Sequence, residues 1–269
     1  MKLTVLVDNN TYIDRYYLGE PAFCCFLEDG DRRILLDTGY SDSFLSNAKK
    51  LGIDMSAVTD IVLSHAHNDH TGGLAAFFRA FPAVRPRLTA HPEVFSPRMH
   101  DGLSIGAPLS REEVAAHTVM TLTEKPVRIS EHVLYLGEIP RRTEFETFTV
   151  GTRLTADGWL DDALPDDTAL ALETEQGLFL LPGCSHSGIC NIILRVKELF
   201  PTQPICGLMG GLHLFDWDER ARKTGIFLEH EQIPVLYPCH CTSFAVRAML
   251  SRTLPLTEVG VGLQLELPV

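Results

Sequence analysis

The chain contains no long apolar run and no excess of basic residues. No stretch of about 18 consecutive apolar residues occurs, so we expect no transmembrane helix. Lys and Arg together number 23 against 35 Asp and Glu, which gives a formal net charge of −12. Because nucleic acids and anionic membranes favour clustered Lys and Arg, we expect neither as the main partner. A small-molecule substrate fits this charge better.

A secreted disulfide framework is also missing. The seven cysteines are an odd number, and Cys24 and Cys25 are adjacent. The opening stretch MKLTVLVDNNT carries a short apolar run, without the longer apolar segment and cleavage site of a signal peptide. Both observations favour a reducing cytosol, so we expect a cytoplasmic protein.

What is present is the composition of a globular α/β protein, with 45% apolar and 22% charged residues. Several segments have the alternating or continuous apolar pattern of strands: Lys2–Val7, Phe23–Leu27, Arg33–Asp37, Asp60–Ser64, Ala169–Glu173, Leu178–Leu181, Ile205–Met209 and Val235–Tyr237. A hairpin turn is expected at Glu28–Asp31. Three segments have helical spacing: Ser41–Leu51, which Gly52 would end, Leu74–Phe81 and Gly188–Phe200.

A length of 269 residues fits one domain, residues 1–269. The region of about residues 84–158 is less regular and holds several prolines. We expect it to be an insertion that covers a site, rather than a second independent domain.

The stretch IVLSHAHNDHTGG crowds four metal-binding side chains behind an apolar strand. Residues two apart on extended chain point the same way, so His65 and His67 can reach one cation together. After the chain turns, Asp69 and His70 face a neighbouring point. Imidazole nitrogens with one carboxylate suit zinc, with manganese or iron as alternatives. A histidine-rich turn satisfied by hydrogen bonds is the other interpretation, and four such side chains at this spacing count against it.

Two later segments bring further histidines to the ends of predicted strands. LPGCSHSGICN contains His186, and VLYPCHCTS contains His240. Three protein ligands and an open position are typical of catalytic zinc, whereas structural zinc has four protein ligands. The hypothesis is a pair of ions, one held by His65, His67 and His186 and the other by Asp69, His70 and His240.

Cysteine and serine near these histidines raise two other possibilities. Cys239 and Cys241 flank His240 and could suggest a thiolate zinc site. With no second cysteine pair, we interpret them mainly as strand residues beside the metal, and Cys184 or Cys239 as redox-sensitive candidates. GCSHS does not form a nucleophile elbow, because Ser187 stands where the final glycine of that motif belongs.

Taken together, these motifs resemble the metallo-β-lactamase fold superfamily. Its HxHxDH signature stands here as His65–His70, LLDTG (Leu35–Gly39) matches its first motif, GCSH its third region and PCHCTS its last histidine. GEIPRRTEFE, GCSHSGICNII, GGLHL and HCTS are similar to a narrower subgroup, the metal-dependent hydrolases related to the dihydropterin phosphate synthase of the archaeal methanopterin pathway.

The resemblance implies an α/β fold, a four-layer αββα sandwich with an inserted substrate-covering segment. It also implies two divalent metal ions with a bridging hydroxide at one edge of the sandwich. In that picture Asp37 does not bind metal but orients a ligand such as His67 or His70. The other interpretation of Asp37 is a turn-forming residue before Thr38 and Gly39.

One feature departs from the superfamily pattern. A bridging carboxylate usually lies between the third and last histidines, and here that neighbourhood reads GLMGGLHLFDWDE. His213 could replace the carboxylate, or it could donate a proton to the leaving group. Without the carboxylate, we expect the second metal to bind more weakly than the first.

The predicted function is a metal-dependent hydrolase that uses a metal-activated hydroxide, with Asp69 accepting or steering a proton. The subgroup resemblance suggests a phosphate-containing, cyclic ester or pterin-related small molecule. The alternative is a catalytically retired metal protein that senses a ligand, which the missing carboxylate favours. A flavodiiron-type oxygen reductase is disfavoured, because His67 stands where such proteins carry Glu.

Three residues are candidates for binding substrate. Arg141 and Arg142, in EIPRR, could clamp a phosphate or carboxylate, or could lie on a solvated turn. His91, like His100 in the same stretch AHPEVFSPRMH, could line the pocket or be an ordinary loop residue.

Overall fold

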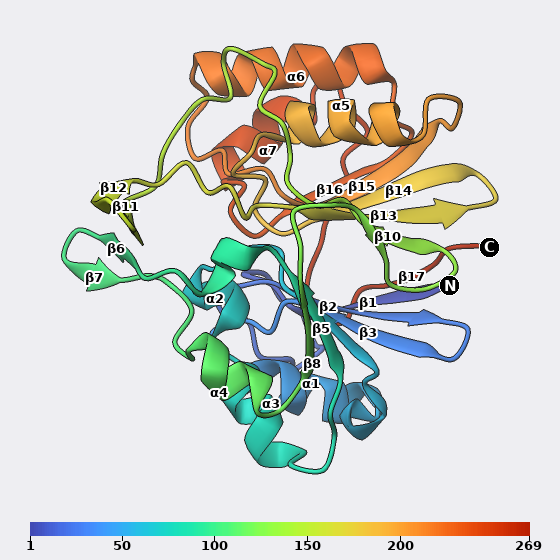
Figure 1. Ribbon diagram of the computed structural model, residues 1–269. Coiled ribbons are helices and arrows are strands. Elements are labelled where there is room, and N and C mark those ends of the chain that lie inside the picture. The colour runs from blue at the N-terminus through green and yellow to red at the C-terminus, as the bar shows by residue number, and fades with distance from the viewer.

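Two mixed β-sheets face each other in the computed structural model, which describes residues 1–269 (Figure 1). The first sheet contains, in spatial order, β17 (Gln264–Glu266), β1 (Lys2–Val7), β2 (Cys24–Asp29), β3 (Arg32–Leu36), β4 (Asp60–Val62), β5 (Arg87–Ala90) and β8 (Val119–Leu122). The second contains β16 (Leu236–Cys239), β15 (Ile205–Gly211), β14 (Gly177–Pro182), β13 (Ala169–Thr174), β10 (Val133–Tyr135) and β9 (Val127–Arg128).

Both faces of each sheet are buried, which explains the continuous apolar runs in the sequence. Successive side chains of a strand point to opposite faces. On β3, Ile34 and Leu36 therefore join the core between the sheets, while Leu35 joins the core under the outer helices. On β14, Phe179 likewise points to the facing sheet and Leu180 away from it.

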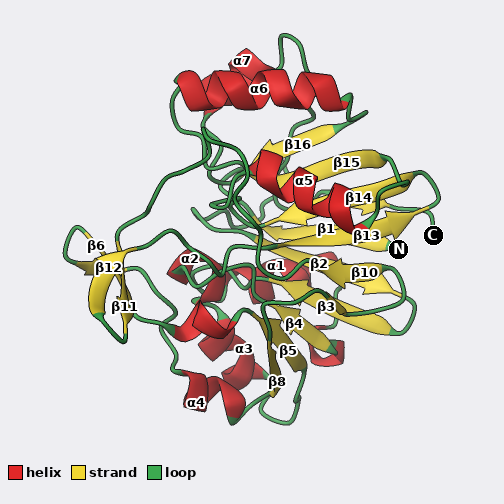
Figure 2. Cartoon of the chain, turned by 45° about the horizontal axis from the view of Figure 1, so that its top comes forward, coloured by secondary structure: helices red, strands yellow, loops and turns green.

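Helices cover the outer face of each sheet (Figure 2). The helices of the first half are α1 (Ser43–Leu51), α2 (Asn68–Thr71), α3 (Leu74–Ala80) and α4 (Arg111–Ala115). Those of the second half are α5 (Ile189–Leu199), α6 (Glu219–Glu231) and α7 (Phe244–Leu250). The four layers confirm the predicted αββα sandwich. None of these helices combines the length and the apolar content needed to cross a bilayer.

The two halves place parallel strands at the same edge of the sandwich. β3, β4, β5 and β8 run parallel in the first sheet, as do β14, β15 and β16 in the second. The carboxyl ends of parallel strands lie on one side of a sheet, so the loops that follow them meet there. Both chain termini lie at the opposite end of the molecule (Figure 1).

Residues 84–158, expected as one insertion, divide between three sheets. β5 and β8 extend the first sheet and β9 and β10 extend the second. Only β6 (Arg98–His100), β7 (Leu103–Ser104) and β11 (Thr152–Thr155), with β12 (Gly158–Asp161) just beyond, form a separate small sheet. This small sheet projects beside the loops at the carboxyl ends of the strands (Figure 2).

Candidate metal centre

The loops after three parallel strands bring the candidate metal-binding side chains together. β4 leads into His65 and His67, β14 into Cys184 and His186, and β16 into His240. Gly73 lets the histidine loop pack tightly, since a β-carbon there would lie 2.2 Å from the carbonyl oxygen of Thr38. Gly183 allows equally close packing between the two halves of the sandwich, since a β-carbon there would lie 2.2 Å from Ser64 Oγ.

His65, His67 and His186 form the first donor group. Their ligand atoms all lie within 4.8 Å of one another, and all three side chains are buried. His65 Nε2, His67 Nε2 and both ring nitrogens of His186 have no hydrogen-bond partner. Buried polar atoms without partners are costly, and convergent imidazole nitrogens are the commonest protein ligands of zinc.

The electrostatics of this first group keep its histidines neutral. Burial lowers the pKa of His67 to about 3, and it lowers the pKa of His65 and His186 well below their usual range. A neutral imidazole carries one ring proton. His65 Nδ1 lies 2.9 Å from Ser64 Oγ, which itself donates to Asp37, so the His65 proton belongs on Nδ1 and its Nε2 is a free lone pair.

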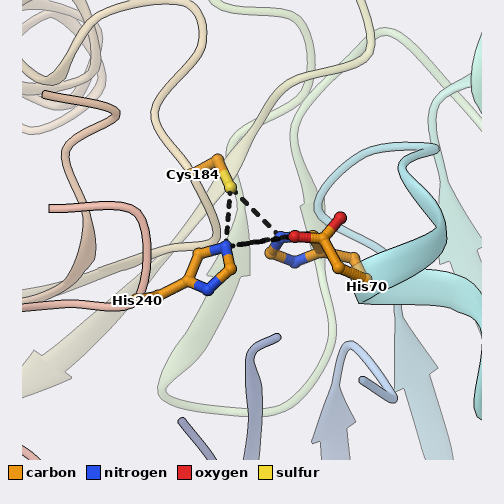
Figure 3. A group of neighbouring side chains, drawn as sticks. His70, Cys184 and His240 are labelled. Carbon is orange, nitrogen blue, oxygen red and sulfur yellow. Dashed lines mark hydrogen bonds and ion pairs between the residues drawn. The ribbon is translucent and has the colours of Figure 1, made fainter. Parts of the chain in front are cut away.

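Asp69, His70, Cys184 and His240 form the second donor group. Figure 3 labels His70, Cys184 and His240, whose donor atoms point toward one another. His70 Nε2 and His240 Nε2 are 3.2 Å apart, and Cys184 Sγ lies 3.1 Å from the first and 3.2 Å from the second. An Asp69 carboxylate oxygen lies 3.4 Å from His70 Nε2 and 3.3 Å from His240 Nε2. His70 Nδ1 donates to Asp37 Oδ2 over 2.7 Å.

This second group attracts positive charge. Burial alone would raise the pKa of Asp69, but His70 and His240 hold it well below its usual range. Burial opposes protonation of His70, yet the carboxylates of Asp69 and Asp37 raise its pKa well above the ordinary value. In the metal-free protein a proton on His70 thus supplies the positive charge that a cation would bring.

The two groups adjoin and open into one cavity. The rings of His65 and His70 have centroids 4.1 Å apart. The cavity has a volume of about 300 Å³, and no Lys or Arg side chain lines it. Tyr40, Ile105 and Phe215 give it apolar surface beside the donor atoms. A small molecule can therefore approach both donor groups at once.

A pair of buried aspartates holds the loops that carry the histidines. Asp166 Oδ2 accepts a hydrogen bond from the backbone of Ala66, between the first two histidines, over 2.8 Å. Asp167 Oδ2 accepts from the backbone of Ser187, next to His186, over 2.8 Å. Arg98, fully buried on β6, pairs with Asp166 over 2.6 Å and connects this support to the small sheet.

The backbone around the site is held in an uncommon conformation. Asp37, Ser185, His213 and His240 have φ values of 57°, 59°, 47° and 49°, in the left-handed region that non-glycine residues rarely adopt. Such residues persist where surrounding structure determines them, and they cluster at functional sites.

His213 lies beside the first donor group but is not a member of either group. Its ring is 4.2 Å from that of His186 and stacks on Phe148 at 5.1 Å. It lines the cavity, its Nδ1 has no partner, and Arg220 donates to its carbonyl oxygen over 2.6 Å. This position suits contact with a bound molecule better than bridging of two ions.

The three candidate substrate-binding residues lie outside the cavity lining. Arg141 donates to the backbone carbonyls of Glu146 and Ala163, and Arg142 pairs with Glu198 on the surface. These contacts occupy both guanidinium groups, so the arrangement offers no arginine clamp.

His91 is held by local contacts as well. The buried ring of His91 accepts a hydrogen bond from the Glu93 backbone, so it caps a short helical turn. His100, by contrast, does line the cavity.

Cys184 is the site residue that the sequence analysis did not place among the ligands. It stands two residues before His186 in a loop that follows a buried strand. The sequence therefore contained evidence that Cys184 could bind metal, because soft thiolate sulfur is a strong zinc ligand and the same loop already supplied a histidine.

Comparisons with known proteins agree with this architecture. The family model for the metallo-beta-lactamase superfamily matches residues 18–201. The 7,8-dihydropterin-6-methyl-4-(β-D-ribofuranosyl)-aminobenzene-5′-phosphate synthase of Methanocaldococcus jannaschii is 30% identical over 81% of this chain and 78% of its own. An uncharacterized protein of the same archaeon is 27% identical over 93% of this chain and 94% of its own.

A solved structure is similar over the full length of both chains. It is that of Tm1679, a metal-dependent hydrolase of the beta-lactamase superfamily, with a TM-score of 0.87 and 28% identity. The family match, the synthase relative and this structure confirm the resemblance seen in the motifs. The chain belongs to the metallo-β-lactamase superfamily.

Proposed function

We propose that the protein is a metal-dependent hydrolase that binds two divalent ions, zinc in the first instance, and acts on a small molecule. Superfamily membership supports an enzyme, and the similar Tm1679 is described as a metal-dependent hydrolase. The observation that carries the proposal is the pair of adjoining donor groups, in which buried histidine nitrogens without partners face a cavity.

The donor sets fit divalent ions of the zinc type. His65, His67 and His186 would hold one ion, and Asp69, His70 and His240 the second. Bound there, the ions would lower the pKa of water toward neutrality and polarise a carbonyl or phosphoryl oxygen. The chain orients its ligands through Asp37, which accepts hydrogen bonds from His70 and Ser64.

Other residues would handle protons and the leaving group. Asp69 keeps a carboxylate oxygen at the second group and also lines the cavity, so it can accept a proton there. His213 lines the same cavity with an unpaired Nδ1, and we assign it as proton donor to the leaving group.

The substrate class follows from the lining and from the relatives. The name of the synthase relative includes a dihydropterin and a phosphate. The cavity here has no arginine or lysine, so a phosphate would have to rely on the ions for charge. Tyr40 and Phe215 offer flat apolar surface. We propose a cyclic ester or phosphate ester attached to a planar ring, with a pterin-like ring as the first choice.

We also place the protein in the cytoplasm. All seven cysteines are free, which suits a reducing compartment.

The test starts with metal content per chain, measured on protein purified without added metal. Wild type should hold about two ions, and His65→Ala and His240→Ala should each lose one. Loaded protein is then assayed on phosphodiesters and lactones, with and without a planar ring. Two ions with turnover that both variants abolish would support the proposal. Bound metal without turnover of any such ester would contradict it and favour a ligand sensor.

A further inference from the structure

The second donor group has four donors where a catalytic ion of this kind usually has three protein ligands and an open position. The donor atoms belong to Asp69, His70, Cys184 and His240. Five of the distances between these atoms are 3.1 to 3.4 Å. Ligands at about 2.0–2.3 Å around a tetrahedral zinc lie about 3.3–3.7 Å from one another. The four atoms therefore already surround a point in nearly the geometry of a tetrahedral ion.

The outer hydrogen bonds of the two histidines leave their Nε2 atoms for the centre of the group. His70 donates its Nδ1 proton to Asp37, and His240 Nδ1 faces the Asn9 side-chain oxygen at 3.2 Å. When the rings are neutral, as metal binding requires, both Nε2 atoms offer lone pairs. The Asp69 carboxylate adds another acceptor. The Cys184 sulfur lies 3.1 Å from His70 Nε2 and 3.2 Å from His240 Nε2, so it is the fourth donor atom directed at the same point.

We infer that Cys184 is a ligand of the second ion, as a thiolate, and takes the place of the bridging carboxylate that the chain lacks. The inference rests on the proposed metal centre and adds to it the identity of the fourth ligand. On binding, the sulfur forms a bond to the ion and its proton leaves to solvent. The second ion is thereby held by Asp69, His70, His240 and Cys184.

This assignment changes what the second ion can do. A soft thiolate favours zinc over the harder manganese ion, so the second group selects its metal by ligand type. Four protein ligands also leave that ion without an open position, so substrate would bind at the first group, where three histidines leave one. The weaker second site expected from the missing carboxylate becomes a tight one.

Cobalt(II) provides a direct readout, because thiolate coordination produces a sulfur-to-cobalt charge-transfer band in the near ultraviolet. Metal-free protein is titrated with cobalt and its absorption spectrum recorded. Wild type should develop the band, and Cys184→Ser should lose it. Cys241→Ser is the matched control, since Cys241 also lines the cavity but belongs to neither donor group. It should keep the band.

The outcomes separate this inference from the proposed function. Wild-type protein that binds cobalt without the band overturns the role of Cys184 and leaves the metal centre standing. A band lost in Cys241→Ser and kept in Cys184→Ser assigns the thiolate elsewhere and also overturns the inference. No cobalt uptake at all would overturn both. If Cys184→Ser does not fold, a wild-type band that Cys241→Ser keeps supports the inference, and a band that Cys241→Ser loses overturns it.

Discussion

One carboxylate orients a histidine in each donor group. Asp37 Oδ2 accepts the Nδ1 proton of His70, and it also accepts the hydroxyl proton of Ser64, whose oxygen faces His65 Nδ1. Both histidines therefore turn their Nε2 atoms toward the other donors of their groups. Outer partners of this kind set the tautomer and the direction of a metal ligand.

Asp37→Asn tests this role at a single atom. Asparagine has the same shape and tolerates the left-handed φ of 57°, but it has a single acceptor oxygen. It therefore cannot accept both from the Ser64 backbone, as Oδ1 does, and from His70 and the Ser64 hydroxyl, as Oδ2 does. We expect zinc affinity to fall about 10–100-fold, the usual effect of losing an outer partner. A chelator-competition titration measures it.

Asp60→Asn is the matched control for that titration. Asp60 is another buried carboxylate of the first sheet, but it pairs with Arg32 and Arg87 instead of a histidine. It should leave zinc affinity unchanged. Equal affinities for wild type and Asp37→Asn would show that His70 is oriented without the carboxylate.

At the scale of elements, the small sheet is joined to the metal loops by a buried ionic contact. Arg98 on β6 pairs with Asp162, which follows β12, and with Asp166, each over 2.6 Å, and all three side chains are fully buried or nearly so. Asp166 in turn holds the backbone of Ala66. The position of the small sheet and the position of the histidine loop are therefore linked.

Arg98→Met should be strongly destabilising. It leaves two buried carboxylates without their cation, and breaking such a contact costs about 3–5 kcal/mol of unfolding free energy. Urea unfolding of the metal-free protein measures the loss. Lys223→Met, which removes an exposed helical ion pair with Glu219, is the control and should change little. A small loss of unfolding free energy in Arg98→Met would mean that water reaches the two carboxylates.

A second contact between elements joins the two sheets. Asp29, at the end of β2, accepts hydrogen bonds from the Ser130 hydroxyl over 2.6 Å and from His132 Nδ1 over 2.8 Å. Although burial opposes it, these bonds keep the pKa of Asp29 below its ordinary value of 3.8. The lowered pKa means that the folded state releases this proton more readily than the unfolded state.

Asp29→Asn should therefore lower the unfolding free energy by about 1 kcal/mol at pH 7. The Asp29 contribution is present above pH 3.8 and is lost as the pH falls through the lower folded pKa, so the difference between wild type and variant should close in acid. Urea unfolding at several pH values measures this. A difference that grew on acidification would contradict the assignment.

The long strands and the clustering of histidines at His65–His70 were predictable because each has a strong local pattern. β1 has the predicted bounds, and Gly52 ends α1 in the left-handed conformation with φ of 73°. β5, β8 and β10 were missed, since strands of three or four residues carry too little alternation to recognise.

The rest of the site depends on contacts between distant parts of the chain. Asp166 touches Ala66 across 100 residues, and Cys184 touches His240 across 56. No local spacing encodes such pairs. The local pattern of EIPRR likewise left two interpretations open for its arginine pair, whose partners here are backbone carbonyls and Glu198.

At the scale of the whole molecule, the donor groups connect the two halves of the sandwich. His65 and His67 follow a strand of the first sheet, while His186 follows a strand of the second. The second group likewise combines His70 with His240. A bound ion would therefore link two sheets that otherwise meet mainly through apolar side chains.

Metal removal should then lower the stability of the entire fold. An ion present at 100 times its dissociation constant adds about 2.7 kcal/mol, which corresponds to roughly 5–10 °C in Tm for a domain of this size. Calorimetry with added zinc and with excess chelator measures the shift. A His65→Ala, His240→Ala double variant should show almost none. An equal shift in that variant would place the stabilising ion elsewhere.

Because the donor residues are spread along the chain, the two donor groups are completed at different times during synthesis. A ribosome makes the first half before the second, so the first donor group is complete once His186 has been made, and the second only once His240 has been made. A chain interrupted between those residues would contain the three histidines of the first group but not His240. The second donor group is thus completed late in synthesis, after most of the chain has been made.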